Sequence, residues 1–149
     1  MILGFVILYM SLQILIPLRH FLYKRDWEWT HEGSNFSWRM MADHHETNGG
    51  ITIEDPRTKN LYVDSPERVL NDRQLVMANN PYMLLQYVQF LEHYLKQQAD
   101  ITDAIIKADI QASVNGKPFQ YLYDPTYNLS EVTYSPFKDL KWVVPLKKE

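Results

Sequence analysis

The sequence contains no cysteine. This absence excludes disulfide bonds, zinc–thiolate sites and a cysteine nucleophile, although it does not identify a compartment. An excess of positive charge is also lacking, since the formal net charge is −3. The composition therefore gives no electrostatic reason to expect nucleic-acid binding. The length of 149 residues is enough for one compact domain with a modest core.

Familiar catalytic motifs are lacking as well. The sequence has no glycine-rich phosphate loop, no G-x-S-x-G and no H-E-x-x-H. The one local cluster of metal-ligand types is DHHE, Asp43–Glu46. Adjacent histidines in a strand point to opposite faces, so we interpret this cluster as a solvated turn. His20, His31 and His93 occur singly, with no neighbour that orients a general base. The sequence therefore predicts no metal and no self-contained catalytic site.

A long apolar run opens the chain. Met1–Leu18 carries no charged side chain, and a helix of that length spans roughly 27 Å, close to the hydrocarbon thickness of a bilayer. We predict a transmembrane helix at residues 1–23 and an extracytoplasmic domain at residues 24–149. A cleaved signal peptide and a buried soluble helix are the alternatives. Because the run starts at the first residue, the pattern looks like the last helix of a longer membrane protein.

Short alternating segments predict an antiparallel sheet. Apolar and polar residues alternate in three segments of the first half, 36–43, 51–54 and 61–63, and strongly over 106–114. Asn115-Gly116 is a strong hairpin signal because both residues tolerate positive φ, and Phe119–Tyr123 is the expected return strand. A short strand is also expected at 142–144. The segments 45–50 and 55–60 are predicted to be turns.

The middle of the chain is predicted to be helical. One or two short helices are expected within 65–80, and Asn80-Pro81 has the composition of a helix start. The helix that follows carries an apolar stripe at three- and four-residue spacing and should end before Asp100; the stripe is Leu84, Leu85, Val88, Leu91 and Leu95. The predicted fold class is α+β, in which an N-terminal transmembrane helix precedes a small antiparallel-sheet domain with two or three inserted helices.

Aromatic residues gather just after the apolar run. Trp27 and Trp29 are predicted to lie at lipid headgroup depth, as indoles often do. Trp38 and Met40 have two interpretations, core packing or the lining of a pocket that would exclude water from a reactive intermediate. The residue pattern by itself favours core packing.

The chain also resembles the vitamin K-dependent gamma-glutamyl carboxylase family. The similar segments follow one another in order over almost the whole chain, and they are Ile16–Tyr23, Trp29-Thr30, Phe36–Met41, Asp55–Thr58, Asp109–Pro125 and Tyr134–Leu146. The second and third carry the W-T and F-S-W-R-M-M motifs. The fourth resembles a D-x-R-T turn, and the fifth resembles a strand, hairpin and Asp-Pro stop.

The resemblance implies an integral membrane enzyme, a lyase by class. Members convert protein glutamate to gamma-carboxyglutamate, using vitamin K hydroquinone, dioxygen and carbon dioxide, and need no metal. Oxygenation of the hydroquinone yields a strong base, which removes the gamma-proton before carbon dioxide is captured. The family's catalytic lysine lies in upstream membrane helices, so the chain is expected to be a C-terminal fragment that is inactive alone.

The same resemblance implies substrate-binding residues. The segment between the W-T and S-W-x-M-M motifs helps hold the substrate glutamate near the vitamin, and the matching positions are Trp29, Phe36, Ser37, Trp38 and Met41. The expected partners are the membrane, the upstream helices and a glutamate-containing protein or peptide. The alternative is a non-catalytic, membrane-tethered binding or structural module.

Overall fold

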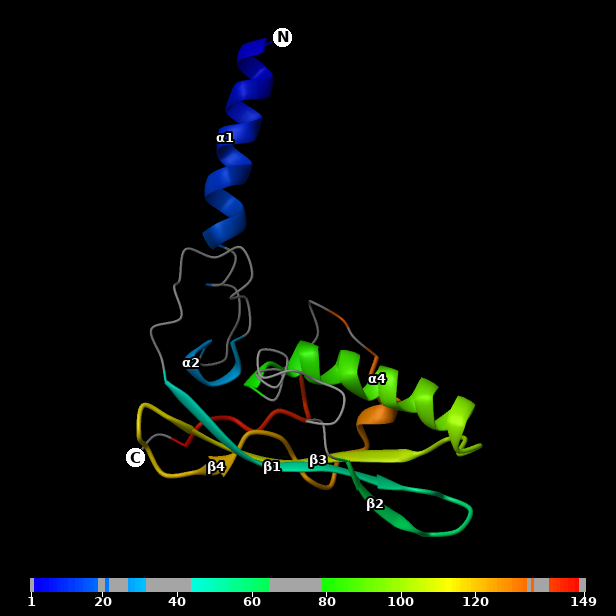
Figure 1. Cartoon of the computed structure of the whole chain (residues 1–149). Helices are drawn as coiled ribbons and strands as arrows, with labels where there is room; N and C mark the ends of the chain where they lie inside the picture. Colours follow the sequence, from blue (N-terminus) through cyan, green and yellow to red (C-terminus); the bar gives the residue numbers. More distant parts are fainter. Residues whose placement is uncertain are drawn as a thin grey trace.

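A four-stranded antiparallel sheet in the order β2-β1-β3-β4 organises the fold. The computed structural model describes residues 2–18, 21, 27–31, 44–64, 79–133, 135 and 140–147. Its helices are α1 (Ile2–Leu18), α2 (Trp27–Thr30), α4 (Pro81–Gln98) and the short 3-10 helix η4 (Leu129–Glu131); its strands are β1 (His45–Glu54), β2 (Leu61–Asp64), β3 (Ile105–Val114) and β4 (Gln120–Tyr121). Helix α4 lies across one face of the sheet (Figure 1). The predicted α+β class, with its antiparallel sheet, is confirmed.

The first hairpin confirms one predicted turn and contradicts another. Residues 55–60 connect β1 to β2, as the sequence predicts. The segment 45–50, however, is strand rather than turn, and it pairs residue by residue with β3 from His45 opposite Val114 onward. The turn prediction is wrong because β3 offers a continuous ladder of hydrogen-bonding partners, and such pairing overrides the weak strand preference of Asn and Gly.

Helix α4 begins and ends where its sequence predicts. The Asn80 side chain accepts hydrogen bonds from the backbone N–H groups of Tyr82 and Met83, and Pro81 occupies the first turn, where its missing N–H costs nothing. Four residues of the predicted stripe are buried and Leu95 is partly buried. The stripe packs on the face of the sheet formed by Ile51, Ile53, Ile106, Ala108 and Ile110.

The second hairpin confirms the Asn115-Gly116 turn, since φ is 53° at Asn115 and 75° at Gly116. The return strand is shorter than predicted, because only β4 pairs with β3 as a strand. The predicted strand at 142–144 is reduced to a bridge between Tyr123 and Val143. The backbone after β4 turns toward the C-terminal segment instead, where Asp124 N–H donates to Trp142 O and Val144 N–H donates to Leu122 O.

The N-terminal helix forms over Ile2–Leu18, and its side chains are exposed except for Pro17. Ser11 donates its hydroxyl to the Ile7 carbonyl, which satisfies that polar group within the helix. Figure 1 shows α1 projecting away from the sheet and from α4. Within the ranges described above, no helix is both long and apolar enough to cross a membrane. The predicted domain boundary after residue 23, the predicted strand at 36–43 and most of the helical segment 65–80 lie outside those ranges.

Candidate functional site

Trp29 is the one predicted substrate-binding residue that the structure describes. Its side chain is 1% exposed, and its indole N–H donates to the Val144 carbonyl at 2.7 Å, which ties α2 to the C-terminal segment. The prediction that Trp29 anchors lipid headgroups is wrong, because protein encloses the ring. The other four predicted residues, Phe36, Ser37, Trp38 and Met41, lie outside the described residues. Their role in substrate binding, and that of Trp29, stays a prediction.

Two histidines meet beside α2, although His31 was predicted to stand alone and His45 to belong to a solvated turn. The Nε2 atoms of His31 and His45 are 3.1 Å apart, and the rings meet edge to face with centroids 4.5 Å apart. His45 Nε2 also lies 2.5 Å from the Glu28 carbonyl oxygen. His44 points elsewhere and contacts Glu46 at 3.3 Å. The described residues on either side of the segment 32–43, which carries four of the predicted substrate contacts, are therefore fixed close together.

The sequence pattern does not predict this pair, for a physical reason. The two histidines are 14 residues apart, and no local period relates a residue after a short helix to the first residue of a strand. One sequence feature bears on it. Adjacent residues of a strand point to opposite faces, so His44 and His45 cannot both face His31. That rule applies only once residues 45–50 are recognised as strand.

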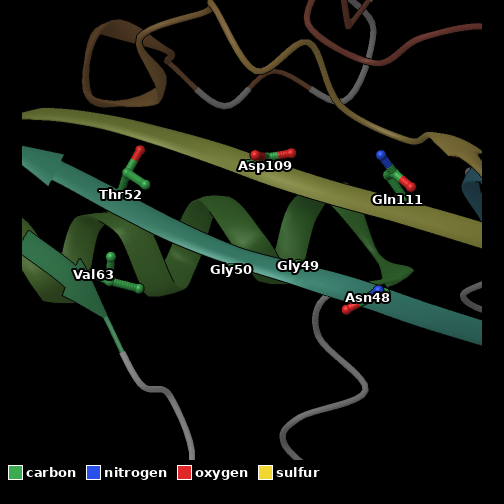
Figure 2. Close-up of a pocket in the computed structure, with 7 residues that line it drawn as sticks. All are labelled: Asn48, Gly49, Gly50, Thr52, Val63, Asp109 and Gln111. Carbon is green, nitrogen blue, oxygen red and sulfur yellow. The ribbon is translucent and has the colours of Figure 1, made fainter.

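A hollow of about 350 Å³ lies on the sheet, and Figure 2 shows its lining along β1, β2 and β3. The lining residues are Asn48, Gly49, Gly50, Thr52, Val63, Asp109 and Gln111. The strand register places Gly50 opposite Asp109. Because Gly50 has no side chain, backbone forms part of the floor, while amide, hydroxyl and carboxylate groups surround it. This hollow could hydrogen-bond a polar ligand, but it holds no nucleophile with an adjacent base.

A second hollow, of about 370 Å³, lies between α4 and the loop that leads to β3. It is lined by Gln89, Glu92, His93, Lys96, Ile101, Thr102, Asp103 and Ala104. Burial raises the pKa of Glu92 above its usual range, and the charge of Asp103 adds to the effect. Most of the side chains that line this second hollow are polar. Over the described ranges, no group of three or more His, Cys, Asp or Glu side chains is placed to hold a metal ion.

The two Asp-Pro turns use the same local chemistry. Asp55 accepts hydrogen bonds from the Arg57 backbone N–H and the Thr58 hydroxyl, which lower the pKa of its carboxyl group. Asp124 accepts from the hydroxyl and backbone N–H of Thr126, and its pKa is lowered for the same reason. The Arg57 guanidinium also donates to the Asp100 carbonyl, which ties the first turn to the loop after α4. The carboxylate form of each aspartate therefore stabilises its own turn.

Comparison with known protein families finds a family model that matches residues 1–149. The matching model is described as "Vitamin K-dependent gamma-carboxylase, lumenal domain". No solved structure matches the chain.

Proposed function

The chain belongs to the vitamin K-dependent gamma-carboxylase family, whose lumenal-domain model matches all of its residues, and we propose that it forms the extracytoplasmic part of a membrane-bound carboxylase. The parent enzyme would convert glutamyl residues of a protein substrate to gamma-carboxyglutamate. The extent of the family match carries this proposal, because it includes the apolar helix, the segment with the predicted substrate contacts and the sheet.

The proposed role of this chain is to present the substrate glutamate. Trp29 supports this role as a buried residue. Its ring and its hydrogen bond to the Val144 carbonyl hold α2 in place. The segment that follows α2 carries the other predicted contacts, Phe36, Ser37, Trp38 and Met41. The contact between His31 and His45 fixes the chain on both sides of that segment. A rigid frame of this kind would position a substrate side chain at small entropic cost.

The described residues do not fit vitamin K itself. A naphthoquinone with an isoprenoid tail needs an enclosed apolar pocket, whereas both hollows are open to solvent and carboxylates line them, Asp109 in the first and Glu92 and Asp103 in the second. No step of the reaction is therefore assigned to these residues. In the proposal, the vitamin and the catalytic lysine belong to membrane helices outside the 149 residues.

Membrane attachment through α1 is part of the proposal, and the exposure of its apolar side chains supports it. We expect the expressed chain to stay in the membrane pellet after alkaline extraction. In the control variant, Leu8→Lys with Leu12→Lys, each charge costs about 2.5–3.5 kcal/mol near the centre of an inserted helix. Most of that variant should therefore be extracted. Release of the unmodified chain into the supernatant, uncut and monodisperse, would contradict attachment through α1.

Trp38 provides the test of substrate contact. In the parent enzyme, Trp38→Ala should lower fixation of labelled carbon dioxide into a glutamyl peptide by about 10-fold or more, since loss of one positioning contact in a transition state costs on the order of 1.4 kcal/mol or more. The melting temperature should fall much less. The 149-residue chain alone is the negative control and should fix none. If the melting temperature collapses while fixation per folded molecule is unchanged, Trp38 is a core residue.

A second candidate function is that of a non-catalytic, membrane-tethered binding or structural module. The open hollow over Gly50 favours it, because its amide, hydroxyl and carboxylate groups could hydrogen-bond a ligand and it holds no nucleophile with an adjacent base. The same fixation assay separates the two functions. A parent protein that binds glutamyl peptides but fixes no carbon dioxide with reduced vitamin K would support the module.

A further inference from the structure

The fold holds His31 and His45 in place from opposite sides. His45 is the first residue of β1 and pairs with Val114. Two hydrogen bonds hold the residue before it, since His44 N–H donates to the Asn115 side chain and Asn115 N–H donates to the His44 carbonyl. His31 follows α2 directly and has a left-handed backbone with φ of 53°. Few residues other than glycine adopt that conformation without support. The neighbouring Trp29, buried and bonded to Val144, supplies such support.

The separation of the two Nε2 atoms suits a shared metal ion. Zinc binds imidazole nitrogen at about 2.0–2.1 Å, so two nitrogens 3.1 Å apart would subtend about 100° at the ion, between the square-planar and tetrahedral angles. Without metal, a hydrogen on His45 Nε2 explains the same geometry, because that N–H faces two acceptors, the Glu28 carbonyl oxygen and His31 Nε2. A bound ion would replace that hydrogen, and Nδ1 of His45 would then carry the ring proton.

We propose that His31 and His45 form a two-histidine site for a divalent first-row transition metal ion such as Zn²⁺, with the Glu28 carbonyl oxygen beside it and water completing the coordination. Imidazole is a preferred ligand of zinc, copper and nickel in proteins. With two side-chain ligands from the described part of the chain, the site binds more weakly than a four-ligand structural centre and exchanges its ion. The proposal does not depend on the carboxylase assignment.

The consequence of metal binding would be local. The ion would join the end of α2 to the start of β1 and so clamp the two ends of the segment 32–43. Because binding to the folded chain alone adds stability in proportion to the logarithm of metal concentration, the site should also raise the melting temperature. This effect is separate from the catalytic role proposed for the upstream helices.

The test uses the full 149-residue chain in detergent, stripped of metal and titrated with Zn²⁺ by calorimetry. We expect one ion per chain, and at least 10-fold weaker binding for each of His31→Gln and His45→Gln. The matched control is His44→Gln, which removes the adjacent exposed histidine and should change the affinity by less than twofold. Cu²⁺ provides a second readout, since electron paramagnetic resonance should show two coordinating nitrogens in the unmodified chain and one in each single variant.

Two results would overturn the proposal. One is binding of the unmodified chain that is weaker than about 1 mM, a free energy of only about −4 kcal/mol. The other is an equal loss of binding in His44→Gln, which would place the ion on the exposed His44–Glu46 pair. Circular dichroism checks that each variant is folded. If His45→Gln disturbs β1, His31→Gln decides the question, because it lies outside the sheet.

Discussion

Replacement of Gly49 by alanine should destabilise the domain far more than the same replacement at the neighbouring Gly50. A Cβ atom at this position would lie 1.9 Å from the backbone oxygen of Asp109 on the neighbouring strand, and φ at Gly49 is +123°. The strands cannot separate locally, because β1 and β3 pair along their whole length. Overpacking and backbone strain each cost about 1–3 kcal/mol, so we expect a loss of roughly 3–5 kcal/mol.

The neighbouring residue gives a matched control. A Cβ atom on Gly50 would meet nothing within 4 Å, so Gly50→Ala should change the free energy of unfolding by less than about 1 kcal/mol. Thermal or urea unfolding followed by circular dichroism measures both variants. For a domain of this size, the Gly49 variant should melt about 10 °C or more below the unmodified chain. Equal melting temperatures for the two variants would show that β1 and β3 are not paired at this position.

Trp29→Ala should produce the second large effect. The side chain is almost fully buried, and its indole N–H donates to Val144 across 115 residues of sequence. Truncating a buried tryptophan typically costs about 3–5 kcal/mol, and the change also leaves the Val144 carbonyl without this donor. Because α2 would lose its attachment to the C-terminal segment, protection from hydrogen exchange should fall first at residues 140–147 and around His31.

A conservative variant separates packing from hydrogen bonding. Trp29→Phe keeps most of the apolar surface but removes the donor, so its cost should be nearer 1–3 kcal/mol. Carbon dioxide fixation by the parent enzyme, measured per folded molecule, then tests whether Trp29 also contacts substrate. A normal melting temperature for Trp29→Ala would mean that the ring does not belong to the core.

The sequence alone predicted the parts of this fold that local chemistry decides. Asn80 and Pro81 meet the hydrogen-bonding needs of the first turn of α4 without any contact from distant residues. The apolar stripe determines which face of the helix is buried. The alternation over 106–114 fixes β3 in the same way, and Asn115-Gly116 fixes its turn because both residues adopt positive φ. The resemblance carried by the W-T and F-S-W-R-M-M motifs predicted the family that the comparison then confirmed.

Tertiary structure decided what depends on distant partners. Residues 45–50 were predicted to be a turn, yet they form six of the ten residues of β1 because β3 pairs with each of them in register. Trp29 was predicted to be a lipid anchor, yet it is buried, because the C-terminal segment packs beside it and accepts its indole hydrogen bond. His31 and His45 meet only because α2 and the sheet are both folded. Sequence periodicity records which face of an element avoids water, whereas the choice of neighbour depends on contacts between segments far apart in the chain.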